Sequence, residues 1–181
     1  LGVHIIKENS HLIGLNKNFN ILDRSDSSKL VKECLKELDI DPKQFEPGKI
    51  LNIISREKGN LISQREYLAE GTEKNSYTLK SVTQRVWPLY ENKLKKEKAL
   101  DFDDLLLKTY EILKNNKNIL EQYQNIWKYI HIDEYQDTNK VQYEMSKLLA
   151  EKNKNICVVG DIDQSIYSWR GADIQNILDF E

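Results

Sequence analysis

Two short apolar runs near the end of the chain constrain its fold more than any other feature. Residues 129–132 (Tyr-Ile-His-Ile) and 156–159 (Ile-Cys-Val-Val) are each typical of a buried strand, and apolar positions from Val141 to Leu149 keep helical spacing between them. Strands joined by such a helix form a right-handed crossover and lie parallel, so their carboxyl ends share one edge of the sheet. The sequence therefore predicts an α/β fold with a ligand site at that edge.

The long segment before this crossover has the pattern of helices only. A cap at Ser25 and Asp26 is expected to open the first helix, and Pro47 suits the first turn of the second, whose mostly apolar stripe includes Lys58. In a third helical stretch, Pro88 removes a backbone donor and is expected to kink the helix or to begin a new one. The whole segment is therefore predicted to be all-helical.

The flanks of this helical segment show mixed patterns. Residues 1–13 place apolar side chains on one face of a helix, which Gly14 can end. Residues 19–22 are typical of a short strand that belongs to a larger sheet. Asp101 is a good cap for a further helix, which the polar run 115–118 (Asn-Asn-Lys-Asn) interrupts.

Composition narrows the functional classes. Lys and Arg total 27 against 29 Asp and Glu, so the net charge of −2 gives no overall signature of a nucleic-acid-binding protein, and any DNA contact must be local. The basic run at 93–98 is better explained as a solvated helix face. Cys34 and Cys157 have neither disulfide nor zinc spacing, which favours a reducing compartment and a cytoplasmic protein. No apolar stretch is long enough to cross a bilayer, and the start at Leu1 suggests an internal segment of a longer chain.

Two polar motifs follow the predicted strands. The first, at residues 132–139 (Ile-Asp-Glu-Tyr-Gln-Asp-Thr-Asn), places Asp133 and Glu134 directly after a strand. Adjacent carboxylates there suit a magnesium-nucleotide site, because the first can hold the metal while the second reaches the attacking water. Taken alone, such a pair is more often a helix-capping pair. The second motif, at residues 159–173, overturns that interpretation.

The second motif joins an amide, two aromatic rings and an arginine. Gln164 could report the presence or loss of a terminal phosphate through one hydrogen bond. Tyr167 and Trp169 would face the same side of an extended loop and could stack on unpaired bases, while Arg170 could pair with phosphate or with the acidic cluster. Singly, such rings are more often core or interface aromatics. Their position between Gln164 and Gly171 favours base stacking.

Together these residues resemble the signature motifs of a known enzyme family. The runs 132–139 and 159–173, with Leu-Asp-Phe-Asp-Asp-Leu at 100–105, are similar to segments of the UvrD/Rep/PcrA family of superfamily 1 DNA helicases. The resemblance covers the whole chain. It implies a RecA-like P-loop NTPase that uses ATP and magnesium to move 3′-to-5′ along single-stranded DNA and to unwind duplexes from single/double-strand junctions, in DNA repair or replication.

The resemblance assigns an ATP site. It implies that Asp133 serves the magnesium ion, that Glu134 activates water, and that Gln164 contacts the terminal phosphate and links the nucleotide state to the grip on DNA. Arg170 would belong to the same site.

A second group of residues is implied for DNA contact and coupling. Tyr167 and Trp169 would face single-stranded DNA, and Gln136 and Arg170 would help to couple the DNA and ATP sites. Their bonds cannot be assigned from the sequence.

The resemblance also divides the chain. Residues 1–23 and 99–181 would be parts of the first RecA-like domain, and residues 24–98 would be a helical accessory subdomain inserted into it. The phosphate-binding pattern G-x-x-x-x-G-K-[ST] is absent from the sequence, and a second RecA-like domain is not reached. These residues alone are therefore expected to be inactive.

Two other functional classes stay open from the residues themselves. Asp133, Glu134 and Asp161 could form the site of a metal-dependent nuclease, which would cut DNA without ATP and leave Gln164 and Trp169 without a role. Alternatively, the chain could be a non-catalytic module that binds DNA or a partner protein through its helical segment.

Overall fold

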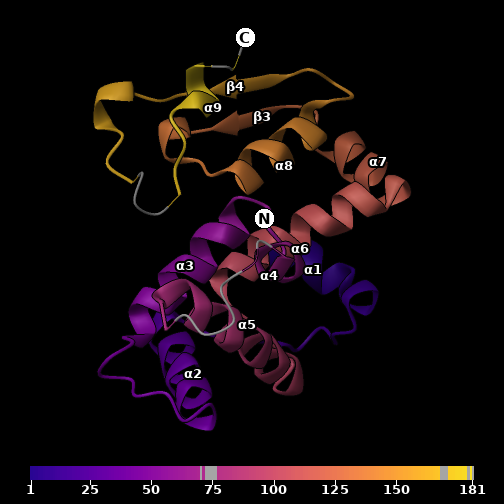
Figure 1. The fold of residues 1–181 in the computed structure, drawn as a ribbon. Helices are drawn as coiled ribbons and strands as arrows, with labels where there is room; N and C mark the ends of the chain where they lie inside the picture. Colours follow the sequence, from indigo (N-terminus) through magenta and orange to yellow (C-terminus); the bar gives the residue numbers. More distant parts are fainter. Residues whose placement is uncertain (70, 72–76, 168–170, 179, 181) are drawn as a thin grey trace.

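The computed structural model describes residues 1–69, 71, 77–167, 171–178 and 180, and combines helices with two small parallel sheets (Figure 1). Its elements, in chain order, are α1 (Gly2–Glu8), a 3-10 helix (Ser10–Ile13), β1 (Asn20–Ile21), α2 (Arg24–Glu37), α3 (Pro47–Gly59), α4 (Gln64–Ala69), α5 (Leu79–Lys96), β2 (Ala99–Leu100), α6 (Phe102–Asn115), α7 (Lys117–Ile126), β3 (Ile130–Ile132), a 3-10 helix (Tyr135–Asp137), α8 (Lys140–Ala150), β4 (Ile156–Val158), a 3-10 helix (Ile162–Gln164) and α9 (Gln175–Leu178). Among these elements, no helix is both long and apolar enough to cross a membrane.

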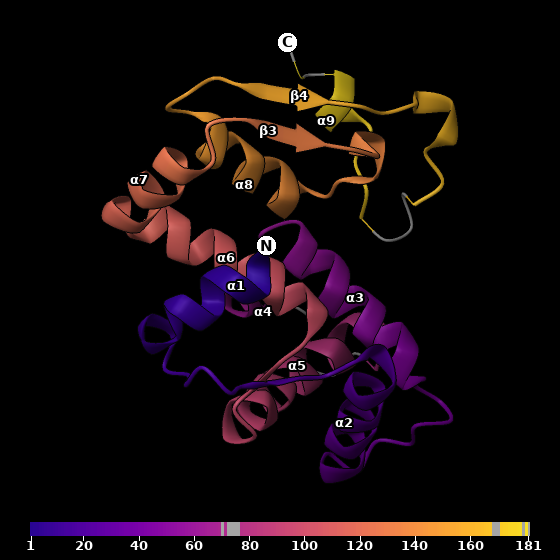
Figure 2. The same ribbon diagram turned by 180° about the vertical axis from the view of Figure 1, so that it is seen from behind.

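The first parallel pair joins strands that lie far apart in the sequence. In β1 and β2, Asn20 pairs with Ala99 and Ile21 pairs with Leu100. Since parallel strands need a crossover connection, α2 to α5 together form one long, helical crossover between two neighbouring strands. Figure 2 shows α2 and α5 at the end of the molecule opposite β3 and β4.

Two hydrophobic cores meet at β2. One lies within the helical crossover and contains Ala99 together with the large buried rings of Trp87 and Tyr90. The other is built from α1, α6, α7 and α8 and contains Leu100 and Tyr123. Successive strand residues point to opposite faces, so the two residues of β2 place one side chain in each core.

A buried ionic cluster also joins the helical crossover to α6. The Nζ atom of Lys58, near the end of α3, lies 2.9 Å from Asp101 Oδ2, 2.8 Å from Asp104 Oδ1 and 2.9 Å from Glu91 Oε1. The Tyr90 hydroxyl donates a further hydrogen bond to Asp101 Oδ2 at 2.9 Å. As predicted, Asp101 caps α6, because its Oδ1 accepts the Asp104 N–H at 2.7 Å. The apolar stripe of α3 therefore ends in a cation that the carboxylates of α5 and α6 surround.

The start of α3 was predicted correctly, whereas the cap of α2 was not. Pro47 occupies the first turn of α3, as expected. The cap of α2 is Asp23, however, and not Ser25 or Asp26, since the Asp23 side chain accepts the Asp26 N–H at 2.8 Å. Asp23 has the extended backbone of a capping residue, whereas Ser25 and Asp26 lie inside the first turn.

The third long helix passes through its proline. α5 is one helix from Leu79 to Lys96, so no new helix begins at Pro88. Trp87 and Tyr90, on either side of the proline, are buried in the same core. Their packing stabilises one continuous helix despite the hydrogen bond that Pro88 cannot donate.

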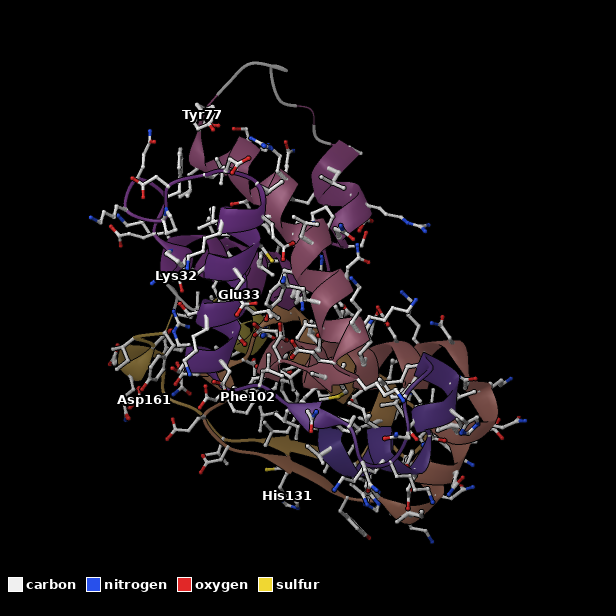
Figure 3. All side chains as sticks on the ribbon, turned by 90° about the horizontal axis from the view of Figure 1, so that it is seen from below. Lys32, Glu33, Tyr77, Phe102, His131 and Asp161 are labelled. Atoms are coloured by element: carbon white, nitrogen blue, oxygen red, sulfur yellow. The ribbon has the colours of Figure 1, made fainter. Side chains whose placement is uncertain are left out.

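The second parallel pair confirms the predicted crossover but is less buried than expected. In β3 and β4, His131 pairs with Cys157, and residues on either side pair in parallel register. His131 and Cys157 are exposed, while their neighbours along each strand are partly buried. Figure 3 shows the His131 side chain projecting outward from the strand pair. The two strands are therefore less buried than the buried strands predicted, because among the described residues α8 covers one face of the pair.

Candidate active site

The carboxyl ends of β3 and β4 bring the two sequence motifs together, as the crossover topology predicts. The Val159 N–H donates to the Ile132 carbonyl at 2.8 Å, and the Tyr135 N–H donates to the Val159 carbonyl at 3.0 Å. The second of these bonds lies beyond the last paired residues of the strands. The carboxylates of the first motif therefore lie beside the start of the second.

Asp133 and Glu134 are exposed where β3 ends. Asp133 Oδ1 accepts the Glu134 N–H at 2.9 Å, and Glu134 has a left-handed backbone with φ 52° and ψ 43°. A non-glycine residue in this region carries strain of about 1–3 kcal/mol, and such strain is concentrated at functional sites. The Glu134 side chain makes no capping bond to the short helix that follows it. The capping explanation of this acidic residue therefore fails.

Gln136 connects the two motifs. Its side chain is fully buried, its Nε2 donates to Glu134 Oε2 at 2.7 Å, and its Oε1 accepts the Asp161 N–H at 3.0 Å. One amide thus bonds to a candidate catalytic carboxylate and to the backbone of the second motif.

Gly160 permits this close approach. A Cβ atom at this position would lie 2.6 Å from Gln136 Oε1 and 2.8 Å from the Cδ1 atom of Ile177. A side chain at this position would force the ends of the Gln136 and Ile177 side chains to shift, so glycine lets the second motif pass the Gln136 amide without displacing it.

Asp161 organises the first turn of the second motif. Its Oδ1 accepts the Asp163 N–H at 3.0 Å, and its Oδ2 accepts the Gln164 Nε2 at 2.7 Å. Figure 3 shows Asp161 at the end of the strand pair. Gln164 is exposed and therefore accessible to a ligand at this edge.

The aromatic and basic part of the motif is described only in part. Tyr167 follows the Gln164 turn and its side chain is 37% exposed. Trp169 and Arg170, predicted for DNA contact and for the ATP site, lie outside the described residues.

The far end of the second motif also returns to the first. The Asp173 N–H donates to the Thr138 carbonyl at 3.0 Å. The buried Asn176 side chain donates from Nδ2 to the same carbonyl at 2.9 Å and to Thr138 Oγ1 at 3.2 Å. The loop between residues 161 and 173 is therefore attached at both ends to the segment that carries the carboxylates.

The sequence pattern did not predict the contacts of Gln136 and Asn176 or the buried oxygen of Asp137. Gln136 and Asn176 make contacts between distant segments, which no local spacing predicts. Asp137 has a buried carboxylate oxygen, Oδ1, with no hydrogen-bond partner in the described part of the chain. In the sequence, only the position of Asp137 within the first motif pointed to a possible role for this residue.

The carboxylates do not form a protein-only metal cage. Within the described ranges, no group of three or more His, Cys, Asp or Glu side chains is placed to hold a metal ion, and the set required by a nuclease, Asp133, Glu134 and Asp161, is not such a group. Mg²⁺ commonly uses one or two carboxylates, waters and the phosphates of its nucleotide. The exposed Asp133 fits an ion that arrives with a nucleotide.

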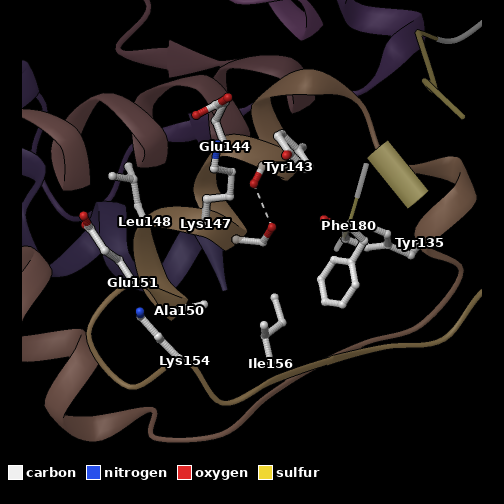
Figure 4. Close-up of a pocket in the computed structure, with 11 residues that line it drawn as sticks. Tyr135, Tyr143, Glu144, Lys147, Leu148, Ala150, Glu151, Lys154, Ile156 and Phe180 are labelled. Atoms are coloured by element: carbon white, nitrogen blue, oxygen red, sulfur yellow. Dashed lines mark hydrogen bonds between the residues drawn. The ribbon is translucent and has the colours of Figure 1, made fainter. Parts of the chain in front are cut away.

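A pocket of about 540 Å³ lies on the α8 side of β4 (Figure 4). There, the rings of Tyr135 and Phe180 meet edge to face with centroids 5.5 Å apart, and Ser146 donates to the Tyr143 carbonyl at 2.7 Å. Its lining includes neither Asp133, Glu134 nor Gln164. The candidate site is therefore the open edge at the strand ends and not this pocket.

Parallel strands that present exposed carboxylates and an amide-bearing loop at one edge are typical of nucleotide-hydrolysing enzymes. Comparison with known families is more specific: residues 1–181 match the model of the UvrD/REP helicase N-terminal domain. The chain belongs to the UvrD/REP helicase family.

Individual relatives agree with this family. The chain is 46% identical over 179 residues to the ATP-dependent DNA helicase PcrA of Staphylococcus aureus, and 46% identical over 179 residues to the protein of the same name from Staphylococcus epidermidis. Each match covers 99% of this chain and 24% of the relative. The chain therefore spans about a quarter of the length of these relatives.

Proposed function

We propose that these residues are part of an ATP-dependent DNA helicase that couples ATP hydrolysis to movement along single-stranded DNA and to duplex unwinding. The observation that carries the proposal is the attachment of the 161–173 loop, at both of its ends, to the segment that carries Asp133 and Glu134. A ligand bound on the loop can thereby influence the geometry of the carboxylates. The relatives named PcrA support the same activity.

The ATP site is proposed at the open edge beyond β3 and β4. In this proposal, Glu134 holds and activates the attacking water as a general base, and Gln164 donates a hydrogen bond to the terminal phosphate. Gln164 donates one N–H of its Nε2 to Asp161, and a glutamine amide has a second N–H that can serve the phosphate. Arg170 is proposed for the same site from sequence alone.

Asp133 is the residue proposed to hold magnesium. Its carboxylate is exposed beside Glu134, which suits an ion shared with nucleotide phosphates. When bound, the ion would neutralise charge that develops on the phosphates during hydrolysis. The role of this chain is to present the carboxylate at a fixed point, which the bond from the Glu134 N–H to Asp133 Oδ1 does.

The DNA side of the site is proposed around Tyr167 and Trp169. Stacking of unpaired bases on such rings is worth about 1–3 kcal/mol for each base. We propose 3′-to-5′ movement, action at single/double-strand junctions, and a role in DNA repair or replication in the cytoplasm.

The division of the chain follows the same proposal. Residues 1–23 and 99–181 would belong to a RecA-like P-loop NTPase domain, and residues 24–98 to a helical accessory subdomain. The sequence contains no G-x-x-x-x-G-K-[ST] loop to cradle phosphates, so we propose that these 181 residues alone do not hydrolyse ATP.

The test is ATP hydrolysis measured with and without single-stranded DNA. The 181-residue chain is compared with a full-length chain that contains it, in the presence of Mg²⁺. An inactive short chain beside a DNA-stimulated full-length chain is the expected result. A full-length chain that binds DNA without hydrolysing ATP would instead support the non-catalytic module.

A further inference from the structure

The last residues of α3 form a turn that anchors the helix to the neighbouring core. The Ile62 N–H donates to the Glu57 carbonyl at 2.9 Å. The Leu61 N–H donates to the Lys58 carbonyl at 3.1 Å, which completes a Schellman motif. Glycine usually occupies the left-handed position of this motif, but here the residue is Leu61, with φ 62°. Its side chain packs against the core of α1, α6, α7 and α8, so a strained backbone is retained where it makes this contact.

Lys58 provides a second anchor at the same end of α3. Its Nζ atom lies 2.9 Å from Asp101 Oδ2 and 2.8 Å from Asp104 Oδ1, and all three residues are buried. Removing one partner of a buried ion pair is strongly destabilising. The end of α3 is therefore fixed to α6, which itself packs against α8.

Gly59 lies between these two anchors and faces the start of α8 (Figure 2). A Cβ atom at this position would lie 3.2 Å from Asn139 Nδ2 and 3.7 Å from Asn139 Cγ. Glycine is less favourable than alanine within a helix, so helix propensity does not account for it here. Glycine instead lets the backbone of α3 approach the Asn139 side chain closely.

Asn139 is held from its other side by α8. As the N-cap of that helix, its Oδ1 accepts the Gln142 N–H at 3.0 Å, and its own N–H donates to Gln142 Oε1 at 3.0 Å. This reciprocal pair is a capping box. The Asn139 side chain is therefore confined between the first turn of α8 and the last turn of α3.

The chain between Glu134 and Asn139 is a tight turn closed by its own hydrogen bonds. The Asp137 N–H donates to the Glu134 carbonyl at 3.0 Å. The Tyr135 carbonyl accepts both the N–H of Thr138 at 3.2 Å and its hydroxyl at 2.7 Å. Tyr135 and Thr138 are buried. Since close-packed segments transmit strain, a displacement of Asn139 is expected to reach Glu134.

We propose that the end of α3 positions the turn that carries Glu134, and that Asn139 is the positioning residue through which it acts. This inference rests on the proposed ATP-hydrolysing function. The helical crossover then influences the rate of hydrolysis from outside the proposed ATP site. A purely structural contact would alter folding stability and leave the reaction unchanged.

The first test is Gly59→Ala in a full-length chain, with ATP hydrolysis measured in the presence of Mg²⁺ and saturating oligo-dT. The added methyl group makes Asn139 give way by a few tenths of an ångström. A misplacement of about 1 Å can cost about a hundredfold in rate, so kcat is expected to fall about threefold to tenfold. The KM for ATP should change little, because Glu134 is proposed to act in the reaction and not in ATP binding.

The second test shortens the side chain on the other side of the contact. Serine caps a helix about as well as asparagine, so Asn139→Ser keeps a cap on α8 but leaves a gap beside Gly59. Its kcat is expected to fall about threefold. In the double variant Gly59→Ala/Asn139→Ser, the added methyl group occupies this gap, and kcat is expected to return to within about twofold of wild type.

Two matched controls carry similar changes elsewhere. Gly48→Ala lies in the same helix, where a Cβ atom meets nothing within 4 Å. Asp23→Ser exchanges the cap of α2, which is exposed. Both controls should retain the wild-type kcat. Thermal melting of every variant measures folding stability separately from turnover.

The outcomes separate this inference from the function on which it rests. A wild-type full-length chain that does not hydrolyse ATP overturns the proposed function and the inference with it. An active wild type in which either single variant keeps the wild-type kcat overturns the inference alone, whatever the melting temperatures. A double variant no more active than the single variants also overturns it. Lower kcat in both single variants, with recovery in the double variant, supports it.

Discussion

Two pairs of neighbouring carboxylates in the chain differ in their surroundings: one pair is buried and the other is exposed. Asp101 and Asp104, at the start of α6, are buried around Lys58. Asp133 and Glu134, at the end of β3, are exposed and bond to a backbone N–H and to the Gln136 amide. Both pairs lie in segments that resemble motifs of the same family, yet only the carboxylates of the second pair are exposed to a ligand.

Burial determines how the first pair ionises. Burial acts to raise the pKa of Asp101, but Lys58, the Asp104 N–H and the Tyr90 hydroxyl together hold that pKa below its usual value. Burial, together with the charges of Asp101 and Glu91, raises the pKa of Asp104 to about 7 despite the attraction of Lys58. Burial disfavours charged Lys58, yet its acidic neighbours raise its pKa well above the usual value. One cation thus serves three acids.

The comparison separates acids whose cation comes from the protein itself from acids that no side-chain cation of the described residues contacts. Where Lys58 supplies it from α3, the carboxylates connect the helical crossover to α6. At Asp133 and Glu134 the hydrogen-bond donors are neutral, and we propose that these acids serve a magnesium ion and a water molecule from outside.

The largest expected effect tests the exposed pair. Glu134→Gln in a full-length chain should reduce ATP turnover about a hundred- to ten-thousandfold, because an amide cannot accept the proton of the attacking water. ATP binding and the thermal midpoint should change little, since Glu134 is exposed. Steady-state hydrolysis and ATP titration measure both, and Glu121→Gln on the exposed surface of α7 is the matched control. Full turnover in Glu134→Gln would show that the exposed pair does not supply the general base.

The next effect tests the buried pair through its cation. Lys58→Met should lower the free energy of unfolding by about 3–5 kcal/mol, because it leaves buried carboxylates without their counter-charge. Urea unfolding of the 181-residue chain measures the loss. Lys49→Met, which breaks an exposed pair with Glu46, should have a much smaller effect. Similar losses in the two variants would mean that burial adds nothing to the Lys58 cluster.

A third prediction concerns pH. The pKa of Asp104 in the folded state is raised to about 7, above its value in the unfolded chain, so the folded state holds more protons between about pH 4 and 7. The stability contributed by Asp104 is therefore greatest at low pH and is lost as the pH rises through 7. The unfolding free energy of wild type minus that of Asp104→Asn should fall over this range. A difference that rises with pH would assign the raised pKa to another group.

The smallest expected effect concerns the far anchor of the 161–173 loop. Asn176→Leu removes the side-chain bonds to Thr138 and should destabilise the chain by about 1 kcal/mol. The loss is limited because the Thr138 carbonyl keeps its bond from the Asp173 N–H. Chemical denaturation measures the change. A loss as large as that of Lys58→Met would show that this anchor, and not only the ionic cluster, dominates stability.

Sequence patterns predicted the secondary-structure elements and their order better than the contacts between distant elements. Repeating features, namely the two apolar runs with a helix between them and caps such as Asp101, gave the parallel crossover and the start of α6. Local patterns failed where distant packing decides. Pro88 does not begin a new helix, because its neighbours pack in a shared core, and the stripe of α3 contained Lys58 but did not reveal its buried acidic partners.

The candidate site shows the same limit. Chain topology alone brings Asp133 and Glu134 beside the second motif, so their neighbourhood was predictable. The bonds of Gln136 were not, because they depend on how two loops pack beyond the ends of the strands. The roles of all the proposed site residues, namely Asp133, Glu134, Gln164, Tyr167, Trp169 and Arg170, remain predictions.

The parallel pairing of β1 with β2 has a consequence for protein engineering. Neighbouring parallel strands cannot be joined by a tight turn, so a shortened chain that keeps this pair must retain a connection of about a dozen residues. Lengthening the connection is much less restricted, since each doubling of a flexible loop costs only about 0.6 kcal/mol. The connection between α2 and α3 is therefore a suitable place to insert a reporter domain, provided that Lys58 stays in contact with α6.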